Sequence, residues 1–121
     1  MNIRKYKFVL FIVIMVSGLF AHPADDINTN FDPIKSVLTV TAIHTVKDVD
    51  DHFIEEISIK LNKKEIITQT FKTQTDLKEA TALYKIIDAK AGDTITVTTK
   101  CNQFGKKTDK ILVPAIQTDE E

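Results

Sequence analysis

The chain has 121 residues, and its composition and charge already exclude several classes of protein. Residues 1–21 contain three basic side chains and no acidic one. Residues 22–121 therefore hold 13 basic and 17 acidic side chains, a formal net charge of −4, which argues against a nucleic-acid binder. Cys101 is the single cysteine, so an internal disulfide and a four-thiolate zinc or iron–sulfur site are excluded.

The first 21 residues have the pattern of a secretory signal peptide. Three basic residues near the start precede an apolar run, Phe8 to Phe20, and Ala21 supplies the small residue at the end. The 13 residues of this run are fewer than the roughly 20 needed to span a bilayer. We expect cleavage after Ala21, an exported (periplasmic or secreted) protein without a stable membrane anchor, and one domain over residues 22–121.

The mature part of the chain has an apolar period of two, which indicates β-strands. Alternation is clear in three segments, Ser36–His44, Phe53–Leu61 and Thr94–Cys101, and weaker in Glu65–Phe71 and Lys110–Val113. Residues 62–64 are a plausible hairpin turn, and Gly92 suits a tight turn that needs a positive φ. About six or seven short strands with regularly spaced turns predict an all-β, immunoglobulin-like β-sandwich.

One segment, Asp76–Ile86, leaves two interpretations open. Leu77, Ala80 and Leu83 have the spacing of an amphipathic helical turn. The alternative is a surface connection followed by a strand that ends at residues 84–86. We favour the strand.

Four residues of the mature chain have side chains suited to a transition metal: His22, His44, His52 and Cys101. His44 and Cys101 each end a predicted strand on its inward face, and His52 follows His44 after a seven-residue loop. The even–odd count places His52 on the opposite face from Ile57, unless the strand begins irregularly. Each residue also has an ordinary interpretation, such as a buried thiol, a loop histidine or a terminal histidine.

Two segments of the sequence resemble the superoxide reductases, the iron-centre domain of desulfoferrodoxin and neelaredoxin. Residues 101–105, CNQFG, resemble the CNxHG segment of that family. His44 followed by residues 51–57, DHFIEEI, looks like its HPMxxxHYIxWI segment, with a loop about two residues longer. His22-Pro23 lies upstream, where the family has its first ligand histidine, so the order His, His, His, Cys is kept.

The resemblance implies a seven-stranded immunoglobulin-like fold with a mononuclear iron site. The family binds iron(II) with four equatorial histidines and an axial cysteine thiolate, and the sixth position is open to superoxide. Carried over, the resemblance makes His22, His44 and His52 equatorial ligands and Cys101 the axial ligand, with Asn102 orienting the thiolate. The thiolate donates electron density that favours electron transfer to superoxide, and an electron donor that the sequence does not name must restore the iron.

The chain departs from the family pattern at two positions. The fourth histidine falls at Phe104, which cannot bind a metal, and the lysine before the first histidine falls inside the signal segment. Cleavage after Ala21 would free the α-amine of His22, which together with its imidazole can chelate a metal. The alternatives are copper or zinc in place of iron, and a metal-free immunoglobulin-like binding or carrier module.

Overall fold

A computed structural model describes residues 22–118, so the predicted signal segment lies outside the described residues. Within this range the chain forms seven strands and no helix, which confirms the all-β prediction. The strands are β1 (Asp26–Asp32), β2 (Val37–Ile43), β3 (Ile54–Leu61), β4 (Lys64–Thr70), β5 (Glu79–Lys85), β6 (Thr94–Cys101) and β7 (Lys106–Leu112). Residues 22–118 contain no helix of the length and apolar character that crossing a bilayer requires.

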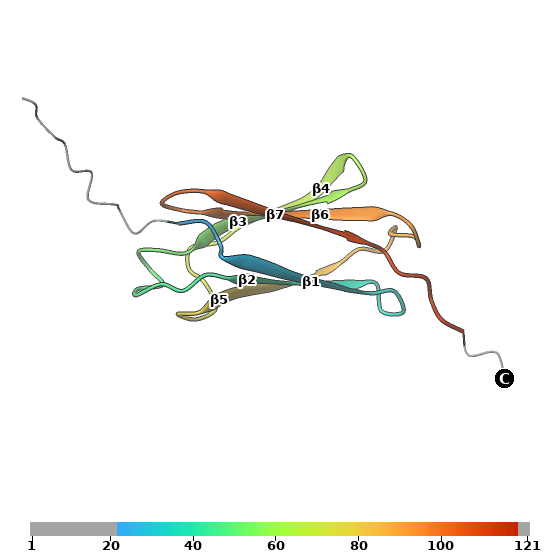
Figure 1. Ribbon diagram of the computed structural model, residues 1–121, viewed down its shortest axis with the longest axis horizontal. Helices are drawn as coiled ribbons and strands as arrows, with labels where there is room; N and C mark the ends of the chain where they lie inside the picture. Colours follow the sequence, from blue (N-terminus) through green and yellow to red (C-terminus); the bar gives the residue numbers. More distant parts are fainter. Residues whose placement is uncertain (1–21, 119–121) are drawn as a thin grey trace, which may run out of the picture.

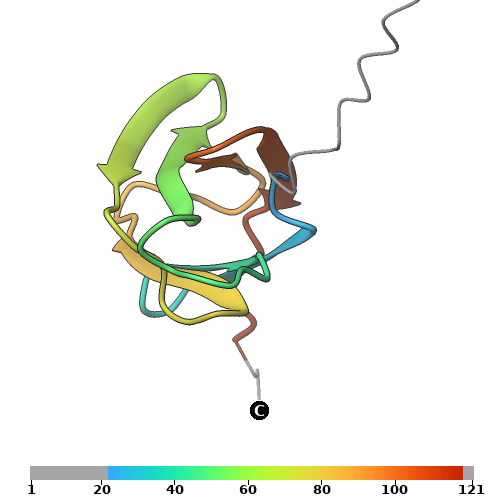
Figure 2. The ribbon, with the colours of Figure 1, turned by 90° about the vertical axis from the view of Figure 1, so that its left-hand side faces the viewer.

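The strands form two antiparallel sheets that face each other as a sandwich (Figure 1). One sheet has the order β1-β2-β5 and the other the order β4-β3-β6-β7. Strands β1 and β7, at the edges of the two sheets, contact each other and close one side of the sandwich (Figure 2). The immunoglobulin-like β-sandwich expected from the spacing of strands and turns is therefore the observed fold.

The core lies between the sheets and is built by strict alternation in the central strands. In β6, Ile95, Val97, Thr99 and Cys101 are all buried while the residues between them are partly exposed. In β2, Leu38, Val40 and Ala42 are buried in the same way. Full burial of an aliphatic side chain contributes about 1.5–3 kcal/mol, so these two strands fix which face of each sheet points inward.

The structure resolves the ambiguous segment and adds one strand that the sequence did not predict. Residues 79–85 are β5, so the strand interpretation is confirmed and the helical one is wrong. Strand β1, with the sequence DINTNFD, was missed because Asp and Asn are depleted in strands. Its two apolar residues, Ile27 and Phe31, are both buried, and the whole strand pairs with β2. Strand β7 begins four residues before the predicted Lys110, as a largely charged edge strand.

An irregularity at the start of β3 determines which face its first residues present. Ile54 pairs with Cys101, and Glu56 pairs with the preceding residue Lys100, so Glu55 is an extra residue in the ladder. As a result Ile54 and Ile57 are both fully buried although they lie three positions apart. The bulge reverses the even–odd count, and His52, two residues before Ile54, comes to the inward side.

Candidate metal site

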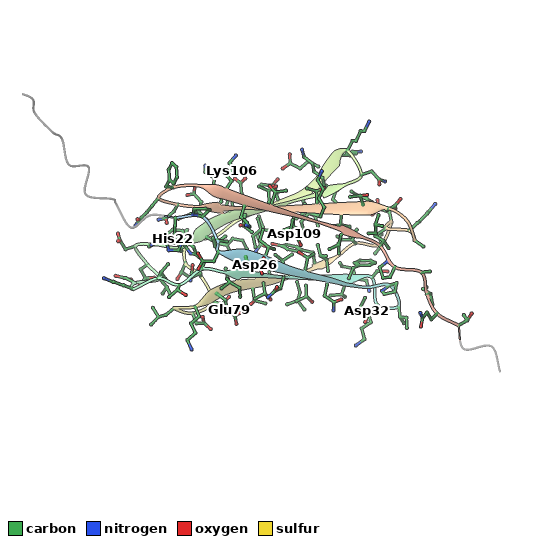
Figure 3. The ribbon with its side chains drawn as sticks, viewed as in Figure 1. His22, Asp26, Asp32, Glu79, Lys106 and Asp109 are labelled. Carbon is green, nitrogen blue, oxygen red and sulfur yellow. The ribbon has the colours of Figure 1, made fainter. Side chains whose placement is uncertain are left out.

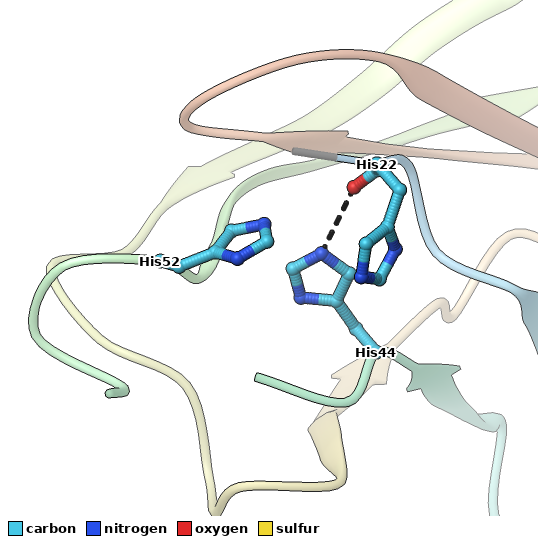
Figure 4. A group of neighbouring side chains, drawn as sticks. All are labelled: His22, His44 and His52. Atoms are coloured by element: carbon cyan, nitrogen blue, oxygen red, sulfur yellow. Dashed lines mark hydrogen bonds between the residues drawn. The ribbon is translucent and has the colours of Figure 1, made fainter. Parts of the chain in front are cut away.

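Three histidines converge at one end of the sandwich (Figure 4). His22 precedes β1, His44 directly follows β2, and His52 lies two residues before β3. His22 is at the end of the molecule where β7 begins with Lys106, opposite the end that holds Asp32 (Figure 3). One ligand nitrogen from each ring lies within 4.8 Å of those of the other two. Segments 30 residues apart in the chain thus bring three imidazoles to one point.

The thiol of Cys101 joins this cluster through His52. The Sγ atom of Cys101 lies 3.1 Å from Nε2 of His52, and Cys101 is almost completely buried. The backbone N–H of Gln103 also points to the sulfur, at 3.5 Å. The structure therefore brings His22, His44 and His52 together, and it places Cys101 next to one of them, His52.

Asn102 connects the end of β6 to the segment that carries His52. Its Oδ1 accepts a hydrogen bond from the N–H of Phe53 at 2.9 Å, and its Nδ2 donates to the carbonyl oxygen of Asp51 at 2.9 Å. Its contact with the sulfur of Cys101 is longer, 3.9 Å. Because the two short bonds flank His52, Asn102 holds that histidine beside Cys101.

His44 is the most enclosed member of the cluster. Its ring is fully buried, with Nδ1 2.8 Å from Oε1 of Gln74 and Nε2 3.0 Å from the carbonyl oxygen of His22. Gln74 lies in the connection between β4 and β5 and is itself buried. Sequence reasoning missed Gln74, because a lone glutamine in the polar stretch TQTD belongs to no recognisable local pattern.

A close approach of two loops holds the segment that carries His22. Gly105 has a φ of +93°, and a Cβ on it would lie 2.8 Å from Cδ of Pro23. The N–H of Asp25 donates to the carbonyl oxygen of Ile43 at 2.7 Å, which anchors the same segment to the end of β2. The position of His22 therefore depends on a glycine far along the chain.

The charges around the histidines favour a cation. Partial burial lowers the pKa of His52, the neighbouring His44 and His22 lower it further, and Asp51 acts in the opposite direction. A lowered pKa keeps this imidazole neutral, which is the form that binds a metal. On the other side of the cluster, a carboxylate oxygen of Asp25 lies 3.9 Å from Nδ1 of His22.

The three imidazoles are close enough together to hold a single metal ion, and the thiol of Cys101 lies beside one of them. Three imidazoles and one thiol suit iron, copper or zinc. Nε2 of His52 and Sγ of Cys101 are 3.1 Å apart, so both atoms could be ligands of one ion. Phe104 is 67% exposed and adds no ligand atom.

Comparison with known proteins supports the fold and gives no family assignment. No protein-family model matches the chain, and no curated protein matches it. Among solved structures, the superoxide reductase (1Fe-SOR) from Giardia intestinalis matches 76% of this chain and 100% of its own with a TM-score of 0.56. The two sequences are 14% identical, so this likeness shows a distantly shared fold.

Proposed function

We propose that this protein binds one transition-metal ion, with iron as the first candidate, through His22, His44, His52 and Cys101. The observation that carries the proposal is the convergence of three imidazoles with a buried thiol at one end of a sandwich. Each donor comes from a different segment, so the cluster is a product of the fold and not of local sequence. Copper or zinc would use the same atoms.

Superoxide reduction is the activity that we propose for the iron-loaded protein. When bound, iron(II) supplies one electron to superoxide, which with two protons becomes hydrogen peroxide, and an external one-electron reductant restores the iron. The chain's own contribution is to hold the imidazoles and the thiol in place. The resemblance of residues 101–105 and the fold of the Giardia reductase support this proposal. We further propose that the protein acts after export.

A second candidate is a metal carrier or storage module without turnover. Asp25 and Asp51, the carboxylates next to the histidines, attract cations and repel an anion such as superoxide. Phe104 also replaces the fourth family histidine. These two observations are the support for the second candidate, a protein that holds the metal without reducing superoxide.

Metal binding is tested with protein that begins at His22, loaded with iron(II) without oxygen, and a Cys101→Ser variant. We expect near one iron per chain in the parent protein and at least a tenfold loss of affinity in the variant. Thr99→Val is the matched control, because Thr99 is buried on the same face of β6 and its hydroxyl has no partner among the described residues. A parent protein that retains no iron, copper or zinc when each is supplied would contradict the proposal.

The two candidate functions differ in what happens to superoxide. A reductase consumes superoxide and forms an equal amount of hydrogen peroxide, whereas dismutation forms half as much. We expect stoichiometric peroxide from the iron(II) protein in pulse radiolysis, and none above background from Cys101→Ser. Stable metal binding without superoxide consumption would select the carrier.

A further inference from the structure

The side-chain amide of Gln74 is held in one orientation by three backbone groups. Its Nε2 donates to the carbonyl oxygens of His44 and Asp76, each at 2.8 Å. Its Oε1 accepts a hydrogen bond from the N–H of Ile54 at 3.3 Å. The opposite orientation would set an oxygen against two carbonyls and an NH2 group against an N–H. The contacts therefore define which end of the amide faces His44.

This orientation fixes where His44 carries its proton. Oε1 of Gln74 lies 2.8 Å from Nδ1 of His44 and is an acceptor only, so Nδ1 must be protonated. A neutral imidazole has a single N–H, and the lone pair is then on Nε2.

The lone pair on Nε2 of His44 meets a second acceptor. Nε2 lies 3.0 Å from the carbonyl oxygen of His22. The dashed line in Figure 4 joins these two atoms. With Nδ1 carrying the proton, both atoms of this contact are acceptors, and a cation between them would be bound by both. The fold thus creates a partly buried point that suits a cation, with a nitrogen and an oxygen donor facing it.

We propose that Gln74 is a positioning residue of the metal site. By keeping Nδ1 of His44 protonated, it directs the Nε2 lone pair at the point where the metal binds, next to the carbonyl oxygen of His22. This inference rests on the proposed metal binding and adds the residue that sets the orientation of one ligand. Partners that fix the second nitrogen of a metal-bound histidine change metal affinity by about 10- to 100-fold when removed.

The test compares Gln74→Met with Gln74→Glu in protein that begins at His22. Methionine has a similar length and removes the acceptor for Nδ1–H, whereas glutamate keeps an acceptor and loses the two donated bonds. Both variants lower the unfolding temperature, because the carbonyls of His44 and Asp76 lose their donor. Only Gln74→Met removes the hydrogen-bond partner of Nδ1 of His44. Gln69→Met, at an exposed position of β4, is the control for the substitution itself.

The first readout is nitrogen-15 NMR of the histidine rings, which reports the protonated nitrogen directly. We expect Nδ1 of His44 to carry a proton in the parent protein and in Gln74→Glu, with and without zinc(II), and this preference to be lost in Gln74→Met. A parent protein in which zinc-loaded His44 has its proton on Nε2 would overturn the inference.

The second readout is the dissociation constant for zinc(II), measured on the folded fraction of each variant. We expect at least tenfold weaker binding in Gln74→Met, binding within about threefold of the parent in Gln74→Glu, and no change in Gln69→Met. Parental affinity in Gln74→Met would overturn this inference and leave the proposed metal site intact. Absence of zinc, iron and copper binding in the parent would overturn both. Should Gln74→Met fail to fold, the NMR of the parent still decides the question, because zinc-loaded His44 with its proton on Nε2 would overturn the inference.

Discussion

At the scale of single residues, Tyr84 shows how this small core tolerates a polar group. The residue is on β5 and faces inward, and its hydroxyl has no hydrogen-bond partner among the described residues. Burial raises the pKa of Tyr84 to about 12. The folded protein therefore favours the neutral phenol. The contribution of neutral Tyr84 to the free energy of unfolding is fully present below pH 10 and is lost as the pH rises toward 12.

We therefore expect Tyr84→Phe to be neutral or stabilising by up to about 1 kcal/mol at neutral pH, because it removes an unpaired buried hydroxyl. It should also abolish the loss of stability between pH 10 and 12. The chain has two tyrosines, and the other is Tyr6, so tyrosinate absorbance reports Tyr84 alone in protein that begins at His22. Ionisation of Tyr84 at the ordinary tyrosine pKa of 10.0 would contradict this account.

Two glycines with similar backbone angles provide a matched pair. Gly105 has a φ of +93° and Gly92 a φ of +89°, but only at Gly105 would an added Cβ meet another residue, Pro23. Gly92→Ala should cost about 1–2 kcal/mol of stability for the backbone angle alone. Gly105→Ala should cost more and should also weaken zinc(II) binding, because it displaces the segment that holds His22.

The measurement is the zinc(II) dissociation constant and the free energy of unfolding of both alanine variants. Gly92→Ala is expected to bind zinc(II) as the parent does. Equal effects of the two changes on zinc(II) affinity would show that the contact between Gly105 and Pro23 does not position the site.

At the scale of elements, the bulge in β3 decides whether His52 can reach the site. Deleting Glu55 would restore a regular ladder and return His52 to the opposite face. Glu55 also forms an ion pair with Lys100 at 3.2 Å, a partly exposed contact that contributes little stability by itself. We expect the deletion to abolish zinc(II) binding at His52 and Glu55→Ala to preserve it, measured by zinc(II) titration and circular dichroism. A folded deletion variant with parental affinity would contradict the role of the bulge.

The elements also show what the sequence could predict. β2 and β6 alternate without interruption, so their inward residues, and the inward positions of His44 and Cys101, follow from period two. β1 has only two apolar residues among polar ones, and its pairing with β2 stabilises it where local propensity does not. The bulge at Glu55 and the buried Gln74 depend on contacts between distant segments, which a local pattern does not encode.

At the scale of the whole molecule, we expect the metal site to depend on where the mature chain begins as well as on the fold. Cleavage after Ala21 remains a prediction, and it would place a free α-amine on His22. An amine and an imidazole on one residue chelate a metal together. Protein that begins at His22 should therefore bind copper(II) at least about tenfold more tightly, about 1.4 kcal/mol, than protein with Gly-Ser before His22.

The two proteins share every residue from His22 onward. In the protein with Gly-Ser, the backbone nitrogen of His22 is an amide and no longer a free amine. Isothermal titration of both forms with copper(II) measures the difference. Equal affinities would show that the imidazole of His22 binds without help from the terminus, and mature protein that begins at Asp25 would remove His22 from the site altogether.

The central claim is that three histidines and Cys101 bind one metal ion together. X-ray absorption of the iron-loaded protein tests it most directly, because sulfur and nitrogen neighbours of the metal are distinguished by their scattering and distance. We predict one sulfur and at least three nitrogen neighbours in protein that begins at His22, with the sulfur contribution lost in Cys101→Ser. Iron bound without any sulfur neighbour in the parent protein would contradict the account.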